Sequence, residues 1–236
     1  NRAAHAQNLL RALDALPTVE ENPGVYLDIH GRSGEVLIGT SLDKGDLTLL
    51  NIRQVESGST DAPHATIFAT AKGLSQLRKK IEDFSTKNSK KKDGSEGRPR
   101  NADLVQSIDA IVEAGLRALW RSPPNHFPST PGQAVWEVWL DRDQAETFID
   151  GAVNYGVTIH SDRLEFPEDL VVLVTAAPNA LATAVRRLAG VRALAAPTTT
   201  PDFFDALAAE EQTTWVDDLL LRTTFANSTD PNYVTL

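Results

Sequence analysis

The chain has 236 residues, of which 41% are hydrophobic and 23% charged, enough for one large domain or two small domains of about 100 residues each. Its net charge of −9 repels phosphate backbones, so we expect no nucleic-acid partner. The absence of cysteine excludes a disulfide framework and a thiolate nucleophile, and it favours a reducing, cytoplasmic compartment. No apolar run approaches ~18 residues, so no membrane span is expected, and the first residues show a helical pattern in place of a signal peptide.

The first half of the chain is expected to form a small unit of mixed helices and strands. Apolar residues at helical spacing predict the helices, and alternating apolar and polar residues predict the strands. The expected helices span residues 2–16, 42–50 and 73–86. The expected strands span residues 25–30, 35–39, 51–56 and 65–71.

A polar and basic stretch, KNSKKKDGSEGRPR, occupies residues 87–100. It holds no apolar residue that could anchor it, so burial cannot offset the entropy lost on ordering it. It also lacks aromatic residues on which bases could stack. We therefore predict a mobile linker loop at this position.

The second half shows a clearer pattern. Asn101 is expected to cap a long helix over residues 101–121, and a proline-rich loop follows at 122–132. Strand, helix, strand, strand, helix and strand are then expected at residues 135–140, 144–155, 157–166, 170–175, 179–189 and 191–195. Gly156 and Gly190 are expected to end the two helices. This order is the split βαβ, or ferredoxin-like, unit.

We therefore predict an α+β fold of two ferredoxin-like (β-α-β-β-α-β) units with connecting and flanking helices. The first unit spans residues 1–100, with the N-terminal helix and the basic loop. The second spans residues 101–225, with a helix before it and another at 202–222, and residues 226–236 form an extended tail. Because the chain begins at Asn1 and contains no methionine, we expect it to be part of a longer polypeptide.

Motifs of common cofactor and metal sites are missing from the sequence. Neither the GxGxxG nor the GxxxxGKS/T phosphate loop occurs. The histidines lie far apart along the chain and form no HExxH-type pair, so we predict neither a metal nor a cofactor. These histidines are His5, His30, His64, His126 and His160.

Asp28, His30 and Ser41 follow the order Asp, His, Ser of some serine-protease triads. Asp28 and His30 would share one face of a single short strand, whereas a triad holds its base between nucleophile and orienting group. Such an arrangement usually draws on distant parts of a chain. We interpret the order as chance and predict no catalytic residue.

Two pairs of acidic residues also have a simple structural interpretation. Asp141 and Asp143 follow a predicted strand, and Asp217 and Asp218 lie in the last predicted helix. Paired acids can perform acid–base catalysis or bind a cation. We favour helix capping for the first pair and solvation or pairing with Arg222 for the second.

Five segments together resemble a known pattern. They are ATIFATAKGLSQLRKKIEDF (65–84), NADLVQSIDAIVEAGLRALW (101–120), VWEVWL (135–140), RLEFPEDLVVLV (163–174) and QTTWVDDLLLR (212–222). Their order and spacing resemble the N-terminal region that precedes the catalytic domain in a group of large bacterial subtilisin-like serine peptidases. The Asp, His-Gly-Thr and Gly-Thr-Ser-Met-Ala elements of that catalytic domain are absent here and would have to lie beyond Leu236.

The resemblance implies a non-catalytic prodomain from a bacterial cytoplasmic peptidase. Subtilase prodomains are similar β-α-β-β-α-β units, whose sheet docks on the catalytic domain of the same polypeptide and assists its folding. Their C-terminal tail lies along the substrate cleft as an inhibitor. Here the tail ends in Tyr233, Val234, Thr235 and Leu236. Such clefts are similar in preferring an apolar last residue and a bulky residue three positions earlier, which Leu236 and Tyr233 match.

Two other functions remain open at this point. A pair of ferredoxin-like units could be a regulatory module that binds a protein or ligand. Trp136 and Trp139 point to opposite faces of one predicted strand, so one of them could be an exposed hot spot for such a partner. A small enzyme would instead need a concave pocket with convergent acids and a perturbed histidine.

Overall fold

The computed structural model describes residues 1–17, 23–34, 39–57, 60–90 and 95–197, together with Thr213, Val216 and Asp217. The chain divides into two compact units, Asn1–Pro197 and Thr198–Leu236. The elements below all belong to the first of these units, which has the predicted α+β composition. Among the described residues, none of the helices is long and apolar enough to cross a membrane.

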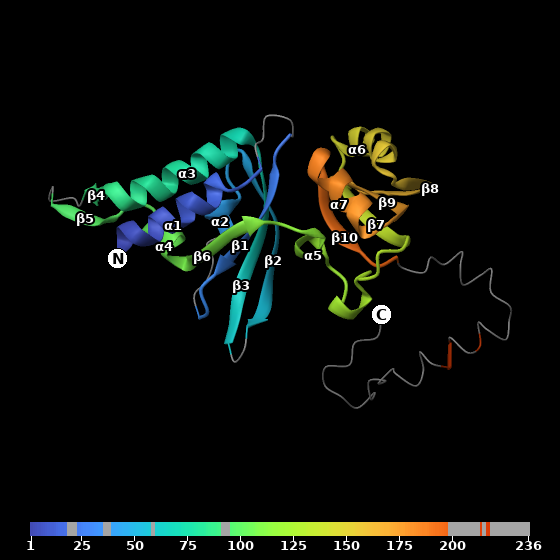
Figure 1. Cartoon of the computed structure of the whole chain (residues 1–236), viewed down its shortest axis with the longest axis horizontal. Coiled ribbons are helices and arrows are strands. Elements are labelled where there is room, and N and C mark those ends of the chain that lie inside the picture. The colour runs from blue at the N-terminus through green and yellow to red at the C-terminus, as the bar shows by residue number, and fades with distance from the viewer. Residues whose placement is uncertain are drawn as a thin grey trace, which may run out of the picture. The chain divides into compact units, whose positions relative to one another are not determined.

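The first sheet has four antiparallel strands in the order β2-β3-β1-β6 (Figure 1). The strands are β1 (Val25–Gly31), β2 (Leu47–Ser57), β3 (Thr60–Ala69) and β6 (Ile108–Glu113). Successive side chains of a strand point to opposite faces. Leu27 and Ile29 therefore enter the core on one face, and Tyr26, Asp28 and His30 point to the other.

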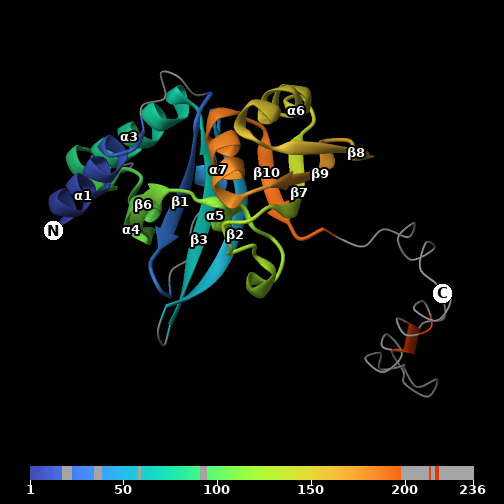
Figure 2. The same cartoon turned by 45° about the vertical axis from the view of Figure 1, so that its right-hand side comes forward.

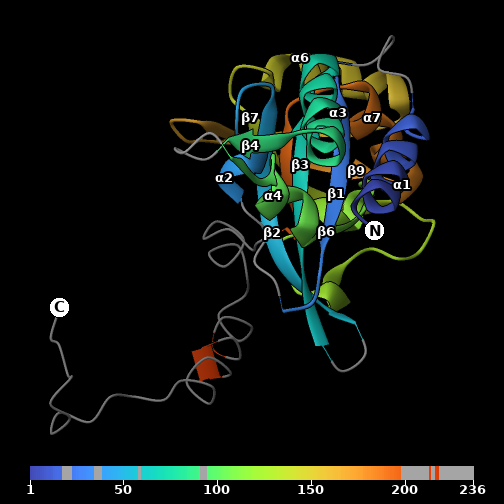
Figure 3. The same ribbon diagram turned by 90° about the vertical axis from the view of Figure 1, so that its left-hand side faces the viewer.

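Two helices cover the first of these faces. They are α1 (Arg2–Asp14) and α3 (Ala71–Thr86), which lie side by side against the sheet (Figure 3). Leu9 of α1 and Leu77 of α3 are buried in the shared core. The order β6-β1-β3-β2 is that of a ferredoxin-like sheet. In the described part of the connection from β1 to β2, the only helix is the short α2 (Gly39–Leu42), and α1 covers the sheet instead.

The second sheet confirms the predicted β-α-β-β-α-β order. Its strands are β7 (Ala134–Asp141), β8 (Thr158–Glu165), β9 (Asp169–Ala176) and β10 (Val191–Ala195), arranged β10-β7-β9-β8. Helices α6 (Ala145–Ala152), with the 3₁₀ turn η3 (Val153–Tyr155), and α7 (Pro178–Arg187) pack on one face (Figure 2). Gly156 and Gly190 follow these helices with φ of 79° and 99°, which glycine adopts without strain.

The expected helix over residues 101–121 is wrong. This segment forms α4 (Ala102–Ser107), strand β6 and the short α5 (Leu116–Leu119). Ile108 and Ile111 are buried in the first core because β6 pairs with β1. Apolar spacing alone fits either element here, and pairing at the sheet edge decides in favour of the strand. Asn101 makes no side-chain cap; its amide donates to the Lys80 carbonyl at 3.1 Å.

Two further expectations in the first half need correction. The expected helix over residues 42–50 is wrong, because α2 ends at Leu42 and β2 begins at Leu47. Gly45, with φ of 70°, turns the chain between them. The expected loop at 87–100 is also wrong in its described part, where β4 (Asn88–Lys90) pairs with β5 (Glu96–Pro99). A guanidinium N–H of Arg2 donates to Asn88 Oδ1 at 2.8 Å and so links this hairpin to α1.

Other expectations fall outside the described residues. They include most of the strand at 35–39, most of the helix at 202–222 and the whole tail at 226–236. Within 202–222, Thr213, Val216 and Asp217 are helical and exposed.

Tyr26 joins the first sheet to the second core. Its ring packs against Phe68 at 4.9 Å between centroids, and its hydroxyl oxygen accepts a hydrogen bond of 3.1 Å from the Val191 N–H at the start of β10. Burial raises the pKa of Tyr26, so the hydroxyl stays neutral at physiological pH. The side chain therefore ties β1 to β10.

Replacing Tyr26 by phenylalanine is expected to lower the free energy of unfolding by about 1–3 kcal/mol, because it leaves the buried Val191 N–H without an acceptor. Urea denaturation followed by circular dichroism measures this loss. Tyr155→Phe is the control, since Tyr155 is only partly buried. Equal losses in the two variants would contradict the assignment.

Candidate functional site

The second sheet has one face covered by α6 and α7 and another that exposes apolar side chains. Trp139, Val171 and Leu164 lie directly opposite one another on β7, β9 and β8, so they share this second face. Leu164 is 57% exposed. Val135 lies four residues before Trp139 on β7, points to the same face and is 41% exposed. Val171, which lies between Trp139 and Leu164 in this row, is itself buried, at 3% exposed. We call the surface formed by Val135, Trp139, Leu164 and Phe166 the open face.

An aromatic pair lies at the centre of the open face. The rings of Trp139 and Phe166 stack with centroids 5.5 Å apart and planes 12° apart, and Phe166 remains 42% exposed. The Trp139 indole N–H donates to Glu137 Oε1 at 2.7 Å, and the Arg121 guanidinium lies 5.9 Å from the ring centroid. The pair is therefore held in one geometry before any partner binds.

Backbone and charged groups also fix the position of Phe166. One guanidinium nitrogen of Arg142 donates to the Phe166 carbonyl at 2.7 Å, and another donates to Glu165 at 2.8 Å. The Phe166 N–H donates to the Asp169 carbonyl at 2.8 Å and closes the turn from β8 to β9. These bonds fix Phe166 at the β8–β9 turn, with its ring against Trp139.

The predicted split of the two tryptophans is confirmed. Trp136 is fully buried in the core beneath α6 and α7, whereas Trp139 is partly exposed on the open face. Sequence reasoning had named Trp139 but missed Leu164 and Phe166. The pairing of β9 with both β7 and β8 places Leu164 in one row with Trp139, with Val171 between them. The tail residues Tyr233, Val234, Thr235 and Leu236 lie outside the described residues.

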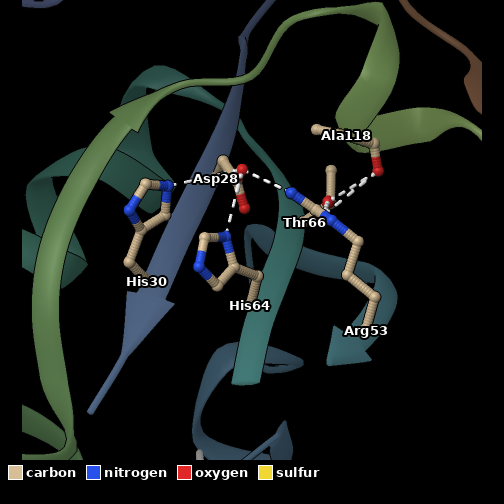
Figure 4. Close-up of polar contacts among 6 residues, drawn as sticks. All are labelled: Asp28, His30, Arg53, His64, Thr66 and Ala118. Carbon is tan, nitrogen blue, oxygen red and sulfur yellow. Dashed lines mark hydrogen bonds and ion pairs between the residues drawn. The ribbon is translucent and has the colours of Figure 1, made fainter. Parts of the chain in front are cut away.

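A polar cluster occupies the face of the first sheet opposite α1 and α3 (Figure 4). Asp28 Oδ2 accepts from Arg53 Nη2 at 2.5 Å and lies 3.5 Å from His30 Nε2 and 3.6 Å from His64 Nδ1. The two imidazole rings stack with centroids 3.9 Å apart. We call Asp28, His30 and His64 the Asp28 cluster.

Arg53 connects the Asp28 cluster to Thr66 of β3 and to Ala118 of α5. Its second guanidinium nitrogen donates to Thr66 Oγ1 at 2.8 Å and to the Ala118 carbonyl at 3.4 Å. The Thr66 hydroxyl donates to the same carbonyl at 2.9 Å. Helix α5 is thereby tied to β2 and β3 beside the Asp28 carboxylate (Figure 4).

The surroundings of His64 favour its neutral imidazole. Burial lowers its pKa, and the nearby His30 lowers it further, against an opposing contribution from Asp28. Within the described part of the chain, His64 Nδ1 and Asp28 Oδ1 are buried without a hydrogen-bond partner. His30 and His64 border an open pocket of about 340 Å³ that also reaches Asp109 on β6.

Ser41 does not join Asp28 and His30. Its carbonyl accepts from Lys80 Nζ of α3 at 2.7 Å, and its neighbour Leu42 is buried in the core between helices and sheet. Asp28 and His30 point to the other face of β1. Ser41 therefore lies on the helical side of the sheet, and Asp28 and His30 lie on the opposite side.

The acidic pair Asp141 and Asp143 supports local structure. Asp141 Oδ1 accepts from the Asp143 N–H at 3.0 Å, and Asp141 Oδ2 accepts from Arg192 at 2.6 Å. The bond between Asp141 and Asp143 closes a turn that precedes α6. The N-cap residue of α6 is Gln144, so neither aspartate caps the helix. Asp217 is exposed, and Asp218 lies outside the described residues.

The prediction that no metal binds rested on the distance between histidines in the sequence. The antiparallel register of β1 and β3 pairs His30 directly with His64, which removes that reason. The sequence signal was weak, since His64 precedes the expected strand 65–71 and the register follows from the fold.

The chain matches no family model and no curated protein sequence.

Proposed function

We propose that the chain is the non-catalytic, prodomain-like N-terminal region of a subtilisin-like serine endopeptidase. In this role it assists folding of the catalytic domain of the same polypeptide and blocks that domain's substrate cleft. The observation that supports this proposal best is the open face of a ferredoxin-like sheet, with exposed apolar side chains around a fixed aromatic pair. The resemblance implies docking through such a sheet.

The open face has the composition of an interface centre. Leu164 and Phe166, which are 57% and 42% exposed, each gain about 1 kcal/mol if a partner buries the rest of the side chain, less the entropy lost on association. Trp139 is a residue type enriched in binding hot spots, and its stacked ring requires little ordering. A hydrophobic surface on the catalytic domain is therefore the partner chemistry that fits this face.

The tail supplies the inhibitory part of the proposal. An extended peptide can add a strand to an exposed sheet edge, with its side chains entering adjacent pockets. Residues 233–236 would occupy the substrate cleft in the manner of a product, with Leu236 and Tyr233 in pockets. Docking of the open face raises the effective concentration of the tail at the cleft.

A second candidate is a regulatory module that binds another protein, and the same open face favours it. The edge strand β8 adds to this case, because almost all of its residues are exposed. In that function the open face alone accounts for binding, and the tail has no role. The tail therefore distinguishes the two candidates.

Deleting residues 232–236 is expected to weaken inhibition of the catalytic domain about tenfold or more, because the apolar pocket contacts are lost. The measurement is the inhibition constant against a fluorogenic peptide. Leu236→Asp is expected to reproduce the loss, and Asn232→Asp, with the same added charge, is the matched control. Full inhibition by the shortened chain would contradict cleft blocking by the tail, and binding without inhibition in the intact chain would favour the regulatory module.

A further inference from the structure

The Asp28 cluster brings three potential metal ligands together from two adjacent strands. Asp28, His30 and His64 each offer one ligand atom, and these three atoms lie within 4.8 Å of one another. Asp28 and His30 lie two residues apart on β1 and so share a face, and His64 faces His30 across the β1–β3 ladder. The arrangement therefore depends on the sheet register, with no flexible loop between its members.

The spacing of these atoms is close to that of a zinc site. Zinc ligands lie about 2.0–2.2 Å from the ion, so tetrahedral ligand atoms are about 3.3–3.5 Å apart. Asp28 Oδ2 lies 3.5 Å from His30 Nε2 and 3.6 Å from His64 Nδ1. Because the two rings stack with planes 25° apart, their nitrogen lone pairs run nearly parallel, so binding of one ion requires the imidazoles to rotate out of the stack.

Two buried atoms in the cluster are without hydrogen-bond partners among the described residues, namely Asp28 Oδ1 and His64 Nδ1. A buried polar atom without a partner is costly and calls for an explanation such as an ion. His64 Nδ1 lies 3.6 Å from Asp28 Oδ2 and so belongs to the spacing already described. The unused Asp28 Oδ1 is the observation that does not depend on this spacing.

Arg53 serves as the orienting group for the carboxylate. It donates to Asp28 Oδ2 and is itself fixed by Thr66 Oγ1 at 2.8 Å. Metal-binding carboxylates are commonly hydrogen-bonded in this way by a second layer of residues. The carboxylate keeps acceptor capacity, because each of its oxygens has two lone pairs and Oδ1 is unused among the described residues.

We propose that Asp28, His30 and His64 bind one Zn²⁺ ion at the edge of the pocket beside β1. Two imidazoles and one carboxylate suit zinc, whereas calcium and magnesium prefer a shell of oxygen ligands. Three protein ligands leave a fourth position, and the pocket that His30 and His64 border supplies access to it. A water molecule or a carboxylate of a partner fits that position. The proposal is independent of the role in a peptidase.

The test is a calorimetric titration of Zn²⁺ into the metal-free chain of residues 1–236. One ion per chain is expected, with an affinity that falls about tenfold or more in His30→Ala and in His64→Ala. His160→Ala is the matched control, because His160 lies on exposed β8 and bonds to Thr175. Absence of binding, or an affinity that His30→Ala and His64→Ala leave unchanged, would overturn the proposal.

Histidine ring signals in the NMR spectrum of the unaltered chain provide a measurement that needs no variant. Addition of Zn²⁺ up to one equivalent is expected to shift the signals of His30 and His64 and to leave those of His5, His126 and His160 in place. Shifts confined to the latter three residues would assign the ion elsewhere and overturn the proposal even if His64→Ala fails to fold.

Discussion

Replacing Trp136 by alanine is expected to lower the free energy of unfolding by about 3–5 kcal/mol, a large part of the stability of a domain of this size. Trp136 is fully buried, and its ring meets those of Trp120 at 5.9 Å and Phe127 at 5.6 Å between centroids. Its indole N–H donates to the Ala176 carbonyl at 3.0 Å. The variant therefore loses aromatic packing, opens a cavity and leaves a buried carbonyl without its donor.

Chemical denaturation followed by circular dichroism measures this effect, and the same strand supplies the control. Trp139→Ala removes an equal number of atoms from the open face, where the ring is partly exposed and packs mainly on Phe166. A much smaller loss is expected for Trp139→Ala. Similar losses in the two variants would contradict the assignment of the two faces.

Replacing Leu164 by aspartate is expected to weaken binding to the subtilisin-like catalytic domain about 30-fold or more, equivalent to about 2 kcal/mol. Leu164 is 57% exposed and lies in one row with Val171 and Trp139. If the open face docks as proposed, the variant buries an unpaired carboxylate at the interface. The stability of the free chain should change little, because the side chain is exposed before docking.

The matched control for this prediction is Val153→Asp. Val153 is 62% exposed on η3, which lies on the helical side of the second sheet, and the substitution adds the same charge. The Val153→Asp chain should bind a catalytic domain with an inactivated serine as tightly as the unaltered chain does, as measured by calorimetry. Equal losses for Leu164→Asp and Val153→Asp would indicate a general charge effect and argue against docking through the open face.

The second sheet and its helices could be predicted from sequence because their signals are local. The strands of residues 135–195 are marked by apolar stretches, such as DLVVLVTA in β9, and Gly156 caps the α6–η3 segment as expected. The expectation that Gly190 ends the other helix is wrong, because α7 ends at Arg187 with Leu188 as its C-cap. The first sheet was harder to predict, because β2 and β6 are edge strands whose apolar residues also fit a helical pattern. Pairing with a neighbouring strand decides their conformation. β2 pairs with β3, and β6 pairs with β1, which is distant from it in the sequence.

The candidate sites also differ in whether local sequence signals or long-range strand pairing determine them. The opposite orientation of Trp136 and Trp139 follows from strand alternation and needs no tertiary information. The Asp28 cluster depends on the register that sets His30 opposite His64, and no local pattern specifies that register. The position of Phe166 over Trp139 likewise depends on the bonds from Arg142 and on the β8–β9 turn.

The most direct test of the proposed role is to titrate the chain of residues 1–236 into the separately produced catalytic domain while following peptide hydrolysis. If the chain docks on the peptidase and fills its cleft, hydrolysis should fall steadily and approach zero near equimolar chain. Hydrolysis that continues unchanged in the presence of excess folded chain would contradict the account.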